Sequence, residues 1–466
     1  MLFSQGTSGL TYGGTNTESG LCLTHSTDGG IILAGNTRSY GSGSNDIYLI
    51  KINEFYQTVW TKVIGSSHQD FARSIITVDD GYVICGESWS YDHGKGGIYL
   101  LKVDTQGNVI TEKSFGIGLL DNCFDIIETS TDKLLFIGYS RSIDIYGGVY
   151  LIMTDKQGNI IWDNTYGFEY DEYAMDVTED SEGNFLIIGS KNGFFDDVHA
   201  TYKTHDADMW VLKIDVEGNV LDNFIYGLDG HDLGYSILPD GDGYLLFGST
   251  QSYGEGSFDM YLTKINNQGN EIWNTTFGGA EFDYGISMAK NNEGSTYLLG
   301  TTKSYAQQGN TDIYLIKIDD LGEEIWSITI GKEYSDYGYD IISTADNGCA
   351  IIGTTTSVDC DTDILFVKIS SNGEIESFTD TNDLLANSYN VLPNPMDTEG
   401  RLNISDGNID RYSMEIVNIS GISVASYILD SSQPNFSVEL LPPGFYIYIL
   451  KNLVTNKQIT GKLAIK

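Results

Sequence analysis

The sequence predicts an all-β chain: a seven-bladed β-propeller of four-stranded antiparallel blades over residues 6–383, a linker over residues 384–390, and a small Ig-like β-sandwich over residues 391–466. Three observations predict this. One segment recurs seven times at a nearly fixed spacing, each copy contains four short apolar runs, and the spacing ends near residue 381, where another pattern of short strands begins.

The repeat is clearest in the segment DIYLIKIDDLGEEIW, which runs from Asp312 to Trp326. Related segments begin at Asp46, Gly97, Gly148, Asp208, Asp259 and Asp363. One column of the alignment holds Lys51, Lys102, Met153, Lys213, Lys264, Lys317 and Lys368, at steps of 51, 51, 60, 51, 53 and 51 residues. A period of this size indicates a repeat architecture, in which each copy is one structural unit.

Each copy is predicted to fold as a four-stranded meander, with strands a, b, c and d in chain order. The four runs are strand-length, rich in Ile, Val, Tyr and Trp, and bounded by Gly, Asp or Asn. A D-x-x-G turn such as Asp319–Gly322 joins c to d, and Asp-Gly turns such as Asp80-Gly81 join a to b. One such sheet cannot bury both of its faces, but seven stacked in a closed ring can.

The ends of the repeat predict how the ring closes. Strand d of the seventh blade is weak, since EIESFTD from Glu374 has few apolar residues. The segment GLTYGG from Gly9 resembles the end of strand d in other copies. We therefore expect the N-terminal strand to complete blade 7, which removes an exposed sheet edge. The strand d tryptophans Trp60, Trp162, Trp273 and Trp326 are expected to pack between blades.

Composition limits the function classes. The formal net charge is −40, and nearly all of it lies before residue 384, so nucleic acid and anionic lipid are not expected partners. No apolar run reaches the roughly 18 residues of a transmembrane helix. Residues 1–5 are too short for a signal peptide, although they could be the end of one. The five scattered cysteines are expected to be small buried residues, and the protein to be a monomer.

The C-terminal region resembles the type A C-terminal sorting domain of the type IX secretion system of Bacteroidetes. The resemblance covers residues 391–466 and rests on Pro393-Asn394-Pro395, on residues 418–421, on the segment LPPGFY from Leu441, and on the final Lys466. It implies that the secretion machinery recognises this region, and that the protein is released or anchored at the cell surface. The repeats themselves resemble those of secreted bacterial propellers of unassigned function, which supports the fold alone.

A column of acids is the first candidate site. Five residues after the glycine that ends each strand d stands an acid, and the column is Glu18, Asp70, Asp121, Glu172, Asp232, Asp283 and Asp336. These carboxylates could form a ring that binds a hard cation such as Ca²⁺. Alternatively, each carboxylate accepts backbone N–H groups of its own d–a turn. Recurrence in all seven blades favours this structural role over the cation site.

The b–c loops are the second candidate site, and they share a face with the d–a turns. We call this the loop face, and the face of the a–b and c–d turns the turn face. Tyr40, Tyr91, Tyr253 and Tyr305 recur in the loop pattern S-Y-G-x-G-x-x-D, where their rings could stack on sugars or pack between blades. Blade 4 has an insertion in this loop with Phe194 and Phe195, which could bind ligand, and His199 and His205, which could hold a metal; a solvated insertion is the alternative.

The predicted function is therefore a secreted or cell-surface binding protein whose loop face engages a glycan or a protein. One alternative is an extracellular polysaccharide-active enzyme, a hydrolase or lyase, that uses carboxylates of the same face. A second alternative is a structural surface or matrix protein. No nucleophile elbow, zinc-protease, P-loop or dinucleotide-binding motif is present in the sequence.

Overall fold

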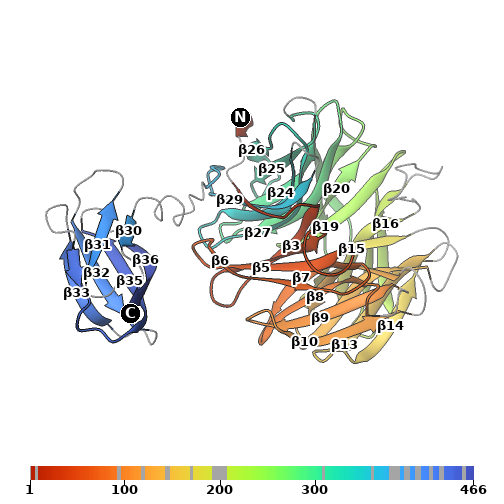
Figure 1. Ribbon diagram of the computed structural model, residues 1–466. Helices are drawn as coiled ribbons and strands as arrows, with labels where there is room; N and C mark the ends of the chain where they lie inside the picture. The colour runs from red at the N-terminus through yellow and green to blue at the C-terminus, as the bar shows by residue number, and fades with distance from the viewer. Residues whose placement is uncertain are drawn as a thin grey trace. The chain divides into compact units, whose positions relative to one another are not determined.

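The structure is a computed structural model, shown in Figure 1. It describes residues 2–5, 9–91, 96–116, 121–141, 147–167, 172–191, 207–306, 310–357, 361–376, 389–392, 399–404, 411–418, 423–429, 435–453 and 458–465. The chain divides into two compact units, Met1–Ser377 and Phe378–Lys466, and each is described by itself.

The first unit is a propeller of seven blades. Blade 1 comprises β3 (Glu18–His25), β4 (Ile31–Thr37), β5 (Asp46–Ile52) and β6 (Thr58–Ile64). Blade 2 comprises β7 (Asp70–Val78), β8 (Gly81–Ser88), β9 (Gly97–Asp104) and β10 (Val109–Phe115). Blade 3 comprises β11 (Asp121–Glu128), β12 (Lys133–Ser140), β13 (Gly148–Asp155) and β14 (Ile160–Tyr166). Blades 4 and 5 comprise β15 (Tyr173–Glu179), β16 (Phe185–Lys191), β17 (Asp208–Ile214), β18 (Val220–Tyr226); β19 (Asp232–Asp240), β20 (Gly243–Thr250), β21 (Asp259–Asn266) and β22 (Glu271–Phe277). Blades 6 and 7 comprise β23 (Asp283–Lys290), β24 (Thr296–Thr302), β25 (Asp312–Ile318), β26 (Glu324–Ile330); β27 (Asp336–Ser343), β28 (Cys349–Thr356) and β29 (Thr362–Ile369).

Each blade pairs its strands in chain order, so every blade is the predicted antiparallel meander. The first strands β3, β7, β11, β15, β19, β23 and β27 contact one another in that order, and β27 returns to β3. The ring is therefore closed, with the first strand of each blade innermost (Figure 1). The seven-bladed prediction is confirmed.

The N-terminal strand closes the ring as predicted. Strand β2 (Leu10–Tyr12) pairs antiparallel with β29 and takes the outer position of blade 7. The segment expected to be a weak strand d contributes one isolated bridge, between Ile369 and Ile375. Strand β1 (Leu2–Gln5) was not expected from the sequence, and it pairs in parallel with the outer strand β26 of blade 6.

The core of the propeller lies between neighbouring blades. Strand β5 is buried along its whole length, and its Leu49 shares one apolar cluster with Ile84 of the next blade. Four lysines of the column are buried too: Lys51, Lys102, Lys317 and Lys368. Lys51 is paired with Asp28 of its own a–b turn, with Nζ 2.7 Å from the carboxylate, and Lys368 is paired with Asp346 at the same distance. Such pairing satisfies a charge that burial would otherwise make costly.

The strand d tryptophans link one blade to the next. Trp162 Nε1 donates to the carbonyl of Val216, at 3.0 Å, in the c–d turn of the following blade. The turn glycine Gly218 has φ of +84°, a conformation that glycine adopts without strain, and it lies against the Trp162 ring. Trp326 donates in the same way to the carbonyl of Ser371. These tryptophans pack between blades, as the sequence indicated.

The second unit contains two sheets. One has the order β30-β31-β34 and the other β33-β32-β35-β36. Their strands are β30 (Tyr389–Leu392), β31 (Glu399–Ile404), β32 (Tyr412–Val417), β33 (Ser423–Leu429), β34 (Asn435–Ser437), β35 (Gly444–Asn452) and β36 (Gln458–Ile465). Phe436 of the first sheet is buried in one cluster with Met414 and Leu450 of the second, so the two sheets pack face to face.

Candidate functional site

The acid column lies at the start of strand a in every blade, and all seven carboxylates are buried. In five blades the carboxylate accepts the backbone N–H of the residue four positions earlier; for Asp283 the donor is Gly279 N at 2.8 Å. A hydroxyl at the end of strand b can donate to the same carboxylate, as Ser88 Oγ does to Asp70 at 2.6 Å. In these five blades the acid thus fastens the preceding d–a turn to its own blade.

Within the described residues, no group of three or more His, Cys, Asp or Glu is placed to hold a metal ion. His199, His205, Phe194 and Phe195 of the blade 4 insertion lie outside the described residues. The described cysteines Cys22, Cys85, Cys123 and Cys349 are buried free thiols.

The loop-face tyrosines pack against a second ring in strand c. Tyr40 lies 5.6 Å from Tyr48, and Tyr91 lies 5.9 Å from Tyr99, measured between ring centroids. Tyr253 and Tyr305 make the equivalent contacts with Tyr261 and Tyr314. The first two tyrosines differ from the others in exposure: Tyr40 is 43% exposed and Tyr91 is 47% exposed, whereas Tyr253 and Tyr305 are half-buried.

Hydrogen bonds hold two of these rings in place. Tyr40 Oη donates to the carbonyl of Gly13 at 2.7 Å, and Tyr305 Oη donates to the carbonyl of Gly278. Both acceptors are glycines of a d–a turn, so the b–c loops and d–a turns do share one face, as the antiparallel order predicted.

A polar ring on strand a was missed by the sequence analysis. Four residues after each column acid, strand a carries a small or acidic residue: Cys22, Ser74, Asp125, Asp176, Ser236, Ser287 and Asp340. These groups bond from blade to blade. Ser74 Oγ donates to Asp125 at 2.6 Å, Ser236 Oγ to Asp176 at 3.0 Å, and Ser287 Oγ to Asp340 at 3.0 Å. The repeat alignment that revealed the acid column also contains this polar ring. The recurring acids Asp125, Asp176 and Asp340 are the signal from which the ring could have been predicted.

Burial perturbs the three acids of this ring. Burial raises the pKa of Asp340 to about 6, although N–H donors such as that of Leu23 oppose the rise. Burial also raises the pKa of Asp176 well above its usual range, and the charge of neighbouring Asp125 adds to the effect. Asp125 and Asp176 belong to neighbouring blades, and they are close enough for the negative charge of Asp125 to raise the pKa of Asp176. Two carboxyl groups in such proximity favour a state in which one of them keeps its proton.

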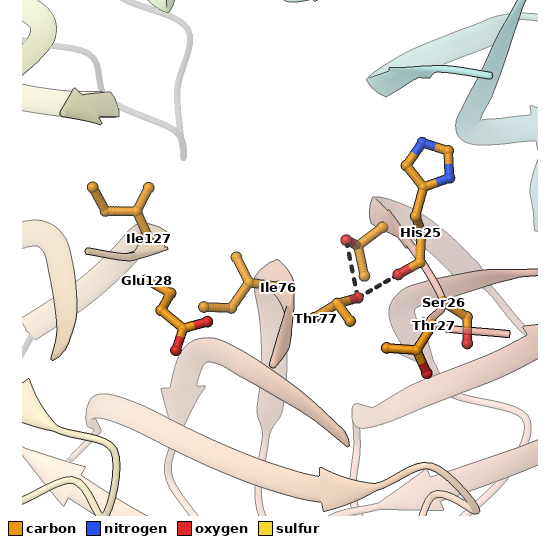
Figure 2. Close-up of a pocket in the computed structure, with 8 residues that line it drawn as sticks. His25, Ser26, Thr27, Ile76, Thr77, Ile127 and Glu128 are labelled. Carbon is orange, nitrogen blue, oxygen red and sulfur yellow. Dashed lines mark hydrogen bonds between the residues drawn. The ribbon is translucent and has the colours of Figure 1, made fainter. Parts of the chain in front are cut away.

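A hollow opens on the turn face, at the opposite end of the strands from the tyrosines. It has a volume of about 470 Å³ and is lined by Thr24, His25, Ser26, Thr27, Ile76, Thr77, Ile127 and Glu128. Figure 2 shows Thr77 bonded to the His25 carbonyl, with Ile76 beside it and Ile127 and Glu128 of the next blade farther along the hollow. Three adjacent blades contribute to it. His25 Nε2 lies 2.8 Å from the carbonyl of Ser343, which fixes its ring toward blade 7.

Comparison with known proteins gives one family match. Residues 390–466 match the family described as the secretion system C-terminal sorting domain. No curated protein matches the chain. The fold and this domain define a propeller protein that is carried out of the cell by its C-terminal unit. That unit is the sorting domain of the type IX secretion system, so the protein is secreted or displayed on the cell surface. A membrane-crossing helix is not found among the described residues.

Several solved structures are similar at low identity. Sqt1 from Chaetomium thermophilum is 9% identical with a TM-score of 0.44, over 78% of this chain and 86% of that one. The structure of YCF48 bound to a D1 peptide is 10% identical with a TM-score of 0.46, over 77% of this chain and 94% of that one. PorZ, a surface component of the type IX secretion system of Porphyromonas gingivalis, is 12% identical with a TM-score of 0.30, over 95% of this chain and 74% of that one. Likeness at this level carries no argument about function.

Proposed function

We propose that this secreted or cell-surface protein binds a glycan on the loop face of its propeller. The observation that supports the proposal is that Tyr40 and Tyr91, on two adjacent blades, are both packed against a second ring and exposed to solvent. Each ring rests on a second tyrosine ring, yet nearly half of each side chain is open to solvent. A ring that is already fixed loses little side-chain entropy when a sugar stacks on it, and so contributes more of its contact energy to affinity.

The charge of the chain narrows the class of glycan. A formal net charge of −40 repels polyanions, so we propose a neutral or amino-sugar polysaccharide rather than a sulfated or uronic-acid one. Tyr253 and Tyr305 belong to b–c loops of the same face and would extend the surface to other blades. Phe194 and Phe195 of the blade 4 insertion are proposed members of this surface from the sequence alone. The experiment below distinguishes glycan binding from two alternatives, which are binding of a protein ligand and catalysis on the polysaccharide.

The experiment is a pull-down of the full chain on insoluble neutral and amino-sugar polysaccharides, with the supernatant assayed for released sugars. Retention without released sugars supports the proposal. Tyr40→Ala and Tyr91→Ala should each weaken binding about 5- to 30-fold, equivalent to about 1–2 kcal/mol per ring. Tyr40→Phe keeps the ring and should bind almost as tightly as the parent protein.

Phe55→Ala is the matched control, because Phe55 is an aromatic residue 71% exposed in a c–d turn on the turn face. Equal loss of binding in Phe55→Ala and Tyr40→Ala would place the site elsewhere. Retention with released sugars would identify an enzyme. Retention on no polysaccharide would exclude the glycan class and leave a protein ligand or a structural role.

A further inference from the structure

The loop pattern S-Y-G-x-G-x-x-D occurs in full in two blades, at residues 39–46 and 252–259. Its last residue, Asp46 or Asp259, begins strand c and is almost completely buried, with 1% and 2% of the side chain exposed. In blades 2 and 3 a glycine, Gly97 or Gly148, stands at this position. The buried acid is thus a property of particular blades and is not required by the fold.

One oxygen of Asp46 is satisfied and the other is not. Oδ2 accepts the backbone N–H groups of Ser42 and Gly43, both at 3.1 Å. Oδ1 is buried and accepts no hydrogen bond from the residues that the structure describes. A buried acceptor without a partner costs about 1–3 kcal/mol, and more when it carries charge, so a stable fold is expected to supply one.

The unpartnered oxygen lies near an acid of the next blade. A Cβ on Gly65 would lie 2.1 Å from Asp46 Oδ1 and 2.8 Å from Asp70 Oδ2, so both oxygens border the same small space beside this glycine. Asp70 is also buried, at 2% exposure. Two carboxylates that share a buried space repel each other unless a proton or a cation lies between them.

Carbonyl oxygens lie beside the glycine of the same b–c loop. A Cβ on Gly43 would lie 2.5 Å from the Ser66 carbonyl oxygen and 2.2 Å from that of His68, both in the adjoining d–a turn. In blade 5 the equivalent point beside Gly256 lies 2.5 Å from the carbonyl oxygens of Gly279 and Glu281, and 3.5 Å from Asp259 Oδ1. Because Gly43 and Gly256 have no side chain, the carbonyl groups of the neighbouring d–a turn can approach the loop that holds the buried carboxylate.

Blade 5 shares the backbone donors and the acid pair of blade 1, whereas the buried oxygen without a hydrogen-bond partner is found for Asp46 and not for Asp259 among the described residues. Asp259 Oδ2 accepts the N–H groups of Glu255 at 2.9 Å and of Gly256 at 3.1 Å. A Cβ on Gly278 would lie 2.0 Å from Asp259 Oδ1 and 2.9 Å from Asp283 Oδ2. The acid pair across the blade boundary is thus the same in both places.

We propose that each of these two loops forms a Ca²⁺ site with the acid of the following blade, Asp46 with Asp70 and Asp259 with Asp283. Two carboxylates and nearby backbone carbonyls are the hard oxygen ligands that Ca²⁺ takes at about 2.3–2.6 Å, with water completing the shell. The acid column contributes to the site one member at a time, paired with a strand c acid, and does not act as a ring.

The electrostatics agree with this geometry. Burial raises the pKa of Asp46, and the charge of Asp70 adds to the rise, while the Gly43 N–H opposes it. Burial and the charge of Asp283 raise the pKa of Asp259 in the same way, against the N–H groups of Gly256 and Glu255. A cation between the two carboxylates would cancel the repulsion between them and offset the effect of burial on both pKa values.

The test is the calcium content of the full chain, measured by elemental analysis after equilibration with Ca²⁺ in 0.5 M NaCl and desalting; the salt screens binding to the acidic surface. Asp46→Asn and Asp259→Asn should each retain one Ca²⁺ fewer than the parent, and the double variant two fewer. Ca²⁺ should raise the melting temperature of the parent, and chelation should lower it. The double variant should lose most of this response.

Asp319→Asn is the matched control, because it removes one carboxylate from an exposed c–d turn where blade 5 naturally has Asn266. It should retain as much Ca²⁺ as the parent. The proposal is overturned if the parent retains no Ca²⁺, or if the double variant retains as much as the parent. The proposal is also overturned if Asp46→Asn is more stable than the parent and Ca²⁺ changes the melting temperature of neither protein. In that case the two carboxyl groups share a proton instead of a cation. The parent measurement does not depend on the folding of any variant.

Discussion

Leu10 lies opposite Phe366 in the antiparallel pairing of β2 with β29, so residues from the two ends of the propeller complete one blade. The remaining blades take all their strands from one continuous stretch of chain, apart from β1 on blade 6. This pairing therefore joins the beginning and the end of the propeller sequence and closes the ring.

Removing residues 1–12 should lower the free energy of unfolding by about 2–4 kcal/mol, because β2 no longer covers the edge of β29 and its hydrogen bonds and side-chain contacts are lost. Urea unfolding of the full chain and the truncated chain measures this. Removing residues 1–8 deletes β1 alone and should cost less than about 1 kcal/mol. Equal effects of the two truncations would contradict the role assigned to β2.

Lys51→Met should cost less than about 1 kcal/mol, whereas Lys51→Ala should cost about 2–4 kcal/mol. Methionine fills the space of the buried lysine stem, as Met153 does in blade 3, and Asp28 is left largely in solvent. Ser26 Oγ and Tyr82 Oη, which contact Lys51 Nζ, also bond to each other at 2.6 Å. Urea unfolding compares the variants, and a larger loss in Lys51→Met than in Lys51→Ala would show that the charge pair matters more than packing.

Asp340 should make stability fall as pH rises from about 4 to about 6. Its pKa is raised to about 6 in the fold, above the ordinary value near 4, so the folded state holds a proton that the unfolded state has released. The stabilisation is complete below pH 4 and is lost as pH passes 6; its size is on the order of 3 kcal/mol. Asp340→Asn should flatten the dependence of unfolding free energy on pH in this window. An unchanged slope would contradict the assignment.

Removing residues 378–466 should leave the propeller folded, with its melting temperature within a few degrees, because the two units are separately compact. The truncated protein should no longer reach the medium or the cell surface, because the sorting domain is lost. Cell fractionation with antibody detection measures the location. As the reciprocal control, residues 378–466 fused to a periplasmic reporter should direct it outward. Normal export of the truncated protein would contradict the role of the domain.

The blade architecture could be predicted because its signals are local. The D-x-x-G turns, the alternation of polar and apolar residues and the 51-residue period each lie within one copy of the repeat. Strand β1 could not be predicted, since its partner β26 is far away in the sequence and the pairing is parallel. The blade 4 insertion, where the sequence indicated His199 and His205, has no repeat partner from which its structure could be inferred.

The polar ring around Asp125, Asp176 and Asp340 was hidden by a bulge. In every blade the pairing of strand a with strand b shifts by one residue after the small residue, as between Cys123 and Asp125. The bulge moves the following residue to the opposite side of the sheet from the one that strict alternation predicts. Simple alternation therefore assigns Asp125 to the wrong side of its blade.

The sequence by itself determined the number of blades, the turn that joins each pair of strands, the strand that closes the ring and the secretion domain at the C-terminus. The tertiary structure decided which acids meet. Asp46 and Asp70 belong to different blades, and so do Asp125 and Asp176, so each pair comes together only when neighbouring blades pack around the axis. Turn chemistry depends on a few adjacent residues, whereas these carboxylate pairs depend on the packing angle between two sheets, which no local pattern encodes.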